Sequence, residues 1–300
     1  CPDHMQHSCL SIVDINRACN LICPVCFADS GTHRSEHYSL AEVEKMLDAV
    51  LANEGEPDVV QLSGGEPTIH PEFFAILAAA RARPIKHLMI NTNGVRIAQD
   101  FEFVEQLAAS GLHGLEIYLQ FDSLDNQVTQ TLRGADLSRI RQQALENLNR
   151  VGLSTTLVVT VAKGVNDHEI GEIIRFAASQ PCVRGVTLQP VQYAGRTHNV
   201  DDRNRLTVSE IRRRIVEQSG IFSEADIMPV PCNPDTLAMG YAFKDESGIL
   251  PLTRYLDPQT LVENAGNTIV FEHDANLKDQ VFKLFSTNHS PESQANCLSE

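Results

Sequence analysis

The chain has 300 residues, of which 42% are hydrophobic and 21% charged, and its formal net charge is −15. This composition is ordinary for a globular protein, and no apolar run reaches the ~18 residues of a membrane-spanning helix. The negative charge argues against a nucleic-acid substrate, because phosphate binding requires a basic surface. The five arginines between Arg203 and Arg214 are better explained as the solvated face of a helix.

Eight cysteines are present, and three of them lie within eight residues of one another. The chain begins Cys1-Pro2-Asp3-His4, without the basic and apolar segments of a signal peptide. In an acidic chain of this kind, clustered cysteines indicate metal ligation rather than a disulfide framework. We therefore expect a protein of the reducing cytoplasm.

Short β-type runs alternate with helical patterns between residues 10 and 189. The expected strands are 10–15, 59–63, 87–91, 115–121, 154–161 and 183–189. The expected helices are 39–53, 71–81, 101–110, 137–151 and 167–179. The first helix has Ser39 at its N-cap position and Glu42 three residues later, which is the pattern of a capping box.

Alternating strands and helices indicate a parallel sheet with helical crossovers. Six such units cannot close an eight-stranded barrel, so we expect an α/β fold with a partial (βα)6 TIM-like barrel over residues 10–199. From about residue 200 a single helix, 207–218, is followed by a proline-rich segment. We expect residues 200–300 to form a C-terminal extension that covers the barrel mouth, and residues 1–9 to be the remnant of a possible metal-binding segment.

The unusual polar segments of the chain follow the expected strands. They are 19–26, 64–67, 91–94, 122–125, 164–167 and 189–196. In parallel α/β folds, functional residues gather at the carboxyl ends of the strands. We therefore expect these segments to form one site on one rim of the barrel.

The first of these segments holds Cys19, Cys23 and Cys26 in a C-x3-C-x2-C spacing. Thiolates are the ordinary ligands of [4Fe–4S] clusters, and three of them leave the fourth iron open to another ligand. A zinc site is an alternative that would need a fourth ligand, such as His33 or His37. Structural free cysteines are the other alternative.

The segment Gly64-Gly65-Glu66-Pro67 follows the second expected strand. Glycines let a backbone approach a ligand closely, and the Glu66 carboxylate could accept a hydrogen bond from an ammonium group. Taken alone, the segment would be a plain Gly-Gly turn. The cysteine motif that precedes it favours a ligand-binding role.

Together these motifs resemble the radical S-adenosylmethionine (SAM) superfamily, and the resemblance extends from about Ser11 to Gly195. It implies that the amino and carboxylate groups of SAM bind the open iron. The residues that it implies around SAM are Gly64, Gly65, Glu66, Pro67, Asn91, Asn93, Asp122, Ser123, Arg133, Val161, Asn166 and Gln189.

The resemblance also suggests a part for each of these residues. Glu66 would bind the methionyl amino group, and Asp122 and Ser123 would meet the ribose or the carboxylate. Arg133 would lie near the SAM carboxylate, with a surface arginine as the alternative. Gln189, with Val161 and Asn166, would border the adenine, and Asn91 to Gly94 would lie beside SAM or form a simple turn.

The chemistry that the resemblance implies is reductive cleavage of SAM. A one-electron donor such as flavodoxin or ferredoxin would reduce the cluster, and a 5′-deoxyadenosyl radical would abstract hydrogen from an unactivated carbon. The protein would contribute positioning and the exclusion of water.

Segments 1–9 and 189–196 resemble a subgroup that includes tetraether lipid synthases and pterin methyltransferase-like enzymes. This resemblance implies carbon–carbon coupling or alkylation of a lipid-like substrate. The sequence departs from the subgroup at Met5 and in lacking a C-terminal cysteine pair. A cofactor- or peptide-maturing radical SAM enzyme is one alternative, and a non-catalytic iron–sulfur or zinc protein is another. The charge disfavours an RNA-methylating enzyme.

Five cysteines lie outside the C-x3-C-x2-C motif. Cys182, between a helix and the sixth strand, is expected to be structural. The others are Cys1, Cys9, Cys232 and Cys297, which lie outside the expected barrel. A second metal site that uses Cys232 and Cys297 is one hypothesis. We favour isolated cysteines, because no C-x2-C pair supports a second cluster.

Overall fold

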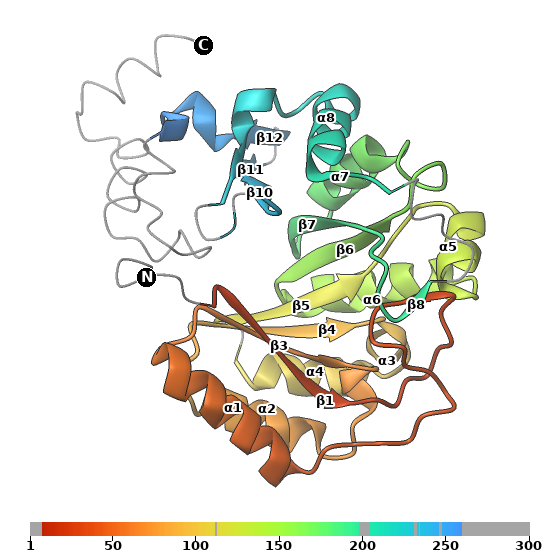
Figure 1. The fold of residues 1–300 in the computed structure, drawn as a ribbon, viewed down its shortest axis with the longest axis vertical. Coiled ribbons are helices and arrows are strands. Elements are labelled where there is room, and N and C mark those ends of the chain that lie inside the picture. The colour runs from red at the N-terminus through yellow and green to blue at the C-terminus, as the bar shows by residue number, and fades with distance from the viewer. Residues whose placement is uncertain are drawn as a thin grey trace. The chain divides into compact units, whose positions relative to one another are not determined.

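The computed structural model describes residues 8–111, 113–197, 205–230, 233, 235–245 and 248–259 (Figure 1). The chain divides into two compact units. One spans Leu10–Gly220, and the other combines Cys1–Cys9 with Ile221–Glu300.

The first unit is built on a six-stranded parallel sheet with the strand order β1-β3-β4-β5-β6-β7. These strands are β1 (Leu10–Asn16), β3 (Val59–Gly64), β4 (His87–Thr92), β5 (Leu115–Gln120), β6 (Thr155–Val161) and β7 (Val183–Pro190). Each strand pairs with the next one along the chain, and β1 and β7 remain as the two edges of the sheet. The expected α/β fold with an open, partial barrel is confirmed.

The helices lie around the outside of the curved sheet (Figure 1). They are α1 (Leu40–Glu54), α2 (Phe73–Arg81), α3 (Val95–Gln99), α4 (Phe101–Ala109), α5 (Asn126–Arg133), α6 (Ser138–Val151), α7 (Ile170–Ser179) and α8 (Val208–Ser219). A 3-10 turn, η1 (Pro67–Ile69), follows β3. The capping box of α1 is present, since the Glu42 carboxylate accepts the Ser39 backbone N–H at 2.8 Å.

Three helical features differ from the sequence-based expectation. Helices α3 and α5 were not expected. Helix α7 begins at Ile170 rather than at residue 167, because the side chains of Asn166 and Asp167 accept backbone N–H groups of the preceding turn. The helix expected over 207–218 is α8, and it belongs to the first unit rather than to the extension. A β-carbon on Gly171 of α7 would lie 2.2 Å from the Gln218 oxygen, which shows how closely α7 and α8 pack.

Side chains of a strand alternate between the two faces of its sheet. Leu88 and Ile90 of β4 and Ile117 and Leu119 of β5 are at most 3% exposed, as expected for the face that the helices cover. The opposite face is called the inner face below. The register places mainly polar side chains on it: Gln61, Ser63, His87, Asn91, Glu116, Tyr118, Gln120, Thr156, Thr160, Thr187 and Gln189. Apolar residues on the same face include Ile12, Val59, Met89 and Val158.

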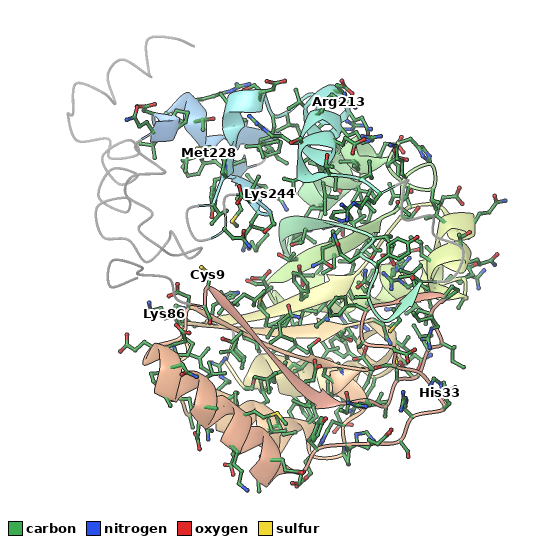
Figure 2. The ribbon with its side chains drawn as sticks, in the orientation of Figure 1. Cys9, His33, Lys86, Arg213, Met228 and Lys244 are labelled. Atoms are coloured by element: carbon green, nitrogen blue, oxygen red, sulfur yellow. The ribbon has the colours of Figure 1, made fainter. Side chains whose placement is uncertain are left out.

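The described part of the second unit contains two antiparallel strand pairs. They are β9 (Ile227–Pro229) with β10 (Ala238–Gly240), and β11 (Ala242–Asp245) with β12 (Gly248–Pro251). The short turns η3 (Glu224–Asp226) and η4 (Leu252–Arg254) flank them. Leu252 and Leu256 form a small core to which Met228, labelled in Figure 2, contributes. Among all described helices, none has the length and apolar character needed to cross a membrane.

Candidate cofactor site at the carboxyl ends of the strands

The loop that follows β1, called the cysteine loop here (residues 17–30), carries Cys19, Cys23 and Cys26. All three cysteines are free and partly buried. Burial above all, with smaller contributions from the nearby Glu66, Cys23 and Cys26, raises the pKa of Cys19 to about 12 despite a lowering hydrogen bond from the backbone of Leu21. Thiols gathered in this way favour a cationic partner, because a bound metal removes the cost of placing several thiolates together.

In the described part of the chain, no three His, Cys, Asp or Glu side chains converge closely enough to hold a single metal ion. A four-iron cluster does not need such convergence, because each thiolate binds a different iron. The donor set therefore fits a [4Fe–4S] cluster. The zinc alternative would require the thiols and a histidine around one ion.

Arg133, at the end of α5, connects the cysteine loop to the sheet. Its Nη1 donates to the Val25 carbonyl at 3.1 Å, and it also donates to the Cys23 sulfur. Its Nε and Nη2 bind both oxygens of Asp122 at 2.7 Å, and Nη2 also reaches Thr160 Oγ1 at 2.7 Å. These bonds match the five N–H groups of a guanidinium. Arg133 therefore holds the cysteine loop to the ends of β5 and β6, and its contact with the SAM carboxylate stays a prediction.

A second arginine, Arg196, binds the cysteine loop from the other edge of the sheet. Its Nε donates to the Cys23 carbonyl at 2.7 Å, its Nη2 to the Ser30 carbonyl at 2.5 Å, and its Nη1 to Asp29 at 3.2 Å. Arg196 lies in β8 (Arg196–Thr197), which pairs antiparallel with β2 (Val25–Cys26). The loops after the two edge strands are thus joined at the carboxyl end of the sheet, and Figure 1 shows β8 beside the loop that follows β1.

Gly195 makes this approach possible. Its φ is +64°, and a β-carbon would lie 2.2 Å from the Phe27 oxygen and 2.3 Å from the Cys26 oxygen. Any other residue would clash with the backbone of the cysteine loop. The sequence singled out 189–196 as unusual, but it gave no indication that Gly195 and Arg196 contact the cysteines.

Gly64 and Gly65 serve a similar close approach. A β-carbon on Gly64 would lie 2.2 Å from the Asn16 oxygen, and one on Gly65 would lie 2.0 Å from the Ala18 oxygen. The N–H of Gly65 donates to the Asn16 carbonyl, and that of Glu66 to the Ala18 carbonyl, both at 2.9 Å. These glycines bring β3 against the base of the cysteine loop, and Pro67 then begins η1.

Glu66 is only 1% exposed, and burial raises the pKa of its carboxyl group. Its Oε1 accepts from the backbone and hydroxyl of Thr68 at 3.1 and 2.6 Å and from the Thr92 hydroxyl at 2.7 Å. Its Oε2 accepts the backbone N–H of Asn93 at 2.7 Å. The Asn93 side chain donates to Asn20 of the cysteine loop at 2.7 Å. The structure thus brings the Gly-Gly-Glu-Pro segment, the end of β4 and the cysteine loop together, as expected.

Asp122 is fully buried with a φ of +64°, and it lies between Arg133 and Arg141 of α6. Its two oxygens accept five hydrogen bonds, from these arginines, the Gln120 side chain and the Thr160 backbone. Burial alone would raise the pKa of Asp122, but the two arginines hold it well below its usual range. The sequence does not indicate the part of Arg141 in this site, because an arginine in an amphipathic helix is ordinarily exposed.

The remaining expected site residues lie near this network. The Ser123 hydroxyl donates to Glu169 at 2.5 Å, and the Asn166 side chain donates to the carbonyls of Asp122 and Thr160 at 2.9 Å. Both side chains are engaged in holding loops. Val161 is 1% exposed at the end of β6. Two expected residues lie on the inner face: Asn91, which donates to Ser63 at 3.1 Å, and Gln189, which donates to the Tyr118 hydroxyl at 3.0 Å.

Of the five other cysteines, the structure describes Cys9 and Cys182. Cys182 is buried, and its backbone N–H is bound by Asn149, so a structural part in the fold agrees with its position. Cys9 is partly buried. The remaining three, Cys1, Cys232 and Cys297, lie outside the described residues, and so does the hypothetical second metal site.

A parallel partial barrel with a three-cysteine loop at its carboxyl rim is the arrangement of an iron–sulfur enzyme core. Residues 13–177 match the family model described as the Radical SAM superfamily. The chain therefore belongs to the Radical SAM superfamily, whose enzymes use a [4Fe–4S] cluster and SAM.

Two curated relatives are similar over most of the chain. The 7,8-dihydro-6-hydroxymethylpterin dimethyltransferase of Methanocaldococcus jannaschii is 31% identical over 297 residues, covering 88% of this chain and 57% of that protein. The GTP 3′,8-cyclase of Cronobacter sakazakii is 29% identical over 237 residues, covering 75% of this chain and 68% of that protein. The chain thus spans little more than half the length of the pterin enzyme.

Solved structures agree with the fold. Streptococcus suis SuiB bound to S-adenosylmethionine has a TM-score of 0.56 and 21% identity, covering 70% of this chain and 46% of that one. A radical SAM methyltransferase from Sphaerobacter thermophilus has a TM-score of 0.51 and 16% identity, covering 71% and 64%.

Proposed function

We propose that this chain is the core of a radical SAM enzyme in which the cysteine loop holds the [4Fe–4S] cluster and Glu66 binds the amino group of SAM. The observation that carries the proposal is the pair of hydrogen bonds through which Asn93 joins Glu66 to the cysteine loop. This pair brings three thiols and a buried carboxylate to one place at the carboxyl ends of the strands.

When bound, the cluster would supply the electron that cleaves SAM into methionine and a 5′-deoxyadenosyl radical. The chain's own residues provide position. Four hydrogen bonds fix the Glu66 carboxylate, and only one of them falls on Oε2. A carboxylate oxygen has two acceptor positions, so Oε2 keeps one that an ammonium N–H could use. Arg133 at the end of α5 and Arg196 in β8 fix the cysteine loop through its backbone carbonyls.

The polar inner face supports a polar substrate rather than a lipid chain. Its side chains include Gln61, Glu116, Tyr118 and Gln189, which offer hydrogen-bond donors and acceptors. An alkyl chain could not use the donor and acceptor positions of these side chains that the protein leaves open, and a buried polar position without a partner costs roughly 1–3 kcal/mol. The names of the two relatives, a pterin methyltransferase and a GTP cyclase, point to fused heterocycles with polar edges. We therefore favour a pterin-like or guanine-like substrate.

The first prediction tests SAM cleavage in the whole chain. After anaerobic reconstitution with iron and sulfide, SAM and dithionite should yield 5′-deoxyadenosine, which mass spectrometry detects. Dithionite takes the place of the flavodoxin or ferredoxin that we expect as electron donor. The triple variant with alanine at Cys19, Cys23 and Cys26 should form none. A reconstituted protein with about four irons and no 5′-deoxyadenosine would favour the non-catalytic alternative.

A further inference from the structure

The inner face of the sheet carries an acidic side chain that takes no part in the cofactor site. Glu116 lies between Leu115 and Ile117 on β5, and its Oε2 is 2.7 Å from Nε2 of His87 on β4. The Glu116 and His87 side chains are 13% and 21% exposed, respectively. Placing a carboxylate in such a position costs free energy that an apolar side chain would not, so the fold alone does not require Glu116.

The geometry leaves acceptor capacity on this carboxylate. In the part of the chain that the structure describes, the hydrogen bond of Glu116 uses Oε2 and none falls on Oε1. Two carboxylate oxygens offer about four acceptor positions in all. Glu116 can therefore accept two parallel N–H groups of a ligand while His87 keeps the carboxylate in one orientation.

Polar side chains continue from Glu116 along the inner face toward the carboxyl end of β5. Tyr118 follows Glu116 on the inner face, and its hydroxyl is held by Gln189 at 3.0 Å and by Thr187. Gln120, four residues beyond Glu116, lies at the carboxyl end of β5. At ~3.3 Å per residue, Glu116 and Gln120 are about 13 Å apart along the strand. A bicyclic ring bound edge-on by Glu116 would point its far side toward the rim where the cysteine loop lies.

We propose that Glu116, oriented by His87, binds the N–H edge of a 2-amino-4-oxopyrimidine ring in the substrate. This ring occurs in pterins and in guanine nucleotides. It presents a ring N–H beside an amino N–H, and the pair matches the two oxygens of a carboxylate. The inference rests on the proposed function and names the substrate class of the same barrel.

Binding measurements with matched ligands test the inference. The probes are pterin and lumazine, which has an oxygen in place of the 2-amino group, and in a second arm GTP and inosine triphosphate, which lacks that group. Wild-type holoenzyme should bind the amino-bearing member of at least one pair about 10- to 100-fold more tightly, the loss expected for one charge-assisted hydrogen bond. The arm that shows the preference distinguishes a pterin from a guanine nucleotide.

The variant Glu116→Gln should lose this preference, because an amide has one acceptor oxygen in place of two. The matched control, Glu105→Gln on the exposed side of α4, should keep it. Iron content shows whether each variant still folds. If Glu116→Gln does not fold, the inference is tested by the affinities of the wild-type protein within the two ligand pairs. Equal affinities within both pairs, or a preference that survives in Glu116→Gln, would overturn the inference. Absence of binding by wild type that still cleaves SAM would also overturn it while leaving the proposed function intact.

Discussion

At the scale of single residues, Asp122 is the buried carboxylate that joins the surrounding side chains at the carboxyl end of β5. It accepts hydrogen bonds from Arg133 and Arg141, and all three side chains are at most 9% exposed. A positive φ is tolerated by aspartate better than by most residues, so the turn after β5 can aim this carboxylate inward. Removal of one member of a buried ion pair leaves the others uncompensated, at a cost of about 3–5 kcal/mol.

The prediction at this scale concerns Asp122→Asn. We expect its melting temperature at pH 7 to fall by on the order of 10 °C, whereas the exposed variant Glu105→Gln should melt like wild type. Because the arginines hold the pKa of Asp122 below its usual range, its stabilising effect is complete above pH ~4 and is lost as the pH falls further. Thermal unfolding is measured at pH 7 and pH 3 on protein without iron. Between these two pH values the melting temperature should fall less in Asp122→Asn than in wild type. Equal losses would contradict this account.

The sequence identified which residues gather at the site more readily than it identified what they do. Cysteine spacing and the Gly-Gly-Glu-Pro segment are local signals, so Cys19 and Glu66 could be placed in advance. The roles of Asp122 and Arg133 depend on how many partners each one has. Those partners come from β6, α6 and the cysteine loop, which are far away in the chain. An arginine whose N–H groups bind the protein and an arginine that binds a ligand are the same letter in a sequence, and only their surroundings distinguish them.

At the scale of elements, the pairing of β2 with β8 is the feature that seats the cysteine loop. Each strand has only two residues, so neither has a sequence pattern that could predict it. Tertiary contacts stabilise the pairing, and they include a cluster of buried apolar side chains that contains Val25 of β2. This group consists of Val25, Val128, Leu132, Ala162 and Val191, with Val165 packed against it. The loop is thus held by α5 and by the residues that directly follow β6 and β7.

The prediction at this scale is that Arg196→Gln loosens the cluster. Its three donors hold the carbonyls of Cys23 and Ser30 and the Asp29 side chain. Loss of one charge-assisted hydrogen bond weakens the equilibrium that holds the loop by roughly 10-fold or more. A chelator should therefore remove iron at least ~10-fold faster from Arg196→Gln than from wild type. Arg196→Lys should fall between the two. The control Arg213→Gln changes an exposed arginine of α8 and should lose iron at the wild-type rate.

If Arg196→Gln retained iron as long as wild type does, the β2 and β8 contact would be unnecessary for holding the cluster. The variant Gly195→Ala gives an independent check, because a β-carbon there meets the oxygens of Cys26 and Phe27. It should disturb the loop by a clash rather than by a lost bond, and we expect the same direction of effect.

At the scale of the whole molecule, the sheet is open, and its inner face lacks the strands that would close a full barrel. A closed barrel of eight strands fills its interior with side chains. Here β1 and β7 are edges, and the inner face keeps side chains such as Ile12 (58% exposed) in contact with solvent. The alternation of strands and helices predicted this architecture, because parallel strands require crossovers. The division at Gly220 was harder to predict. Helix α8 joins the first unit through contacts with α7, and the local sequence does not indicate these contacts.

The last prediction asks how many clusters the whole chain holds. In the described residues, only the cysteine loop brings several cysteines together, and Cys182 is buried with its backbone N–H donating to Asn149 of α6. We therefore expect about four irons per chain after anaerobic reconstitution, the content of one [4Fe–4S] cluster. Cys232→Ala should hold the same amount, and the triple variant of the cysteine loop should hold almost none. A content of about eight irons that falls to about four in Cys232→Ala would instead establish a second cluster. The count is independent of SAM cleavage, so it separates the number of metal sites from the activity of the first one.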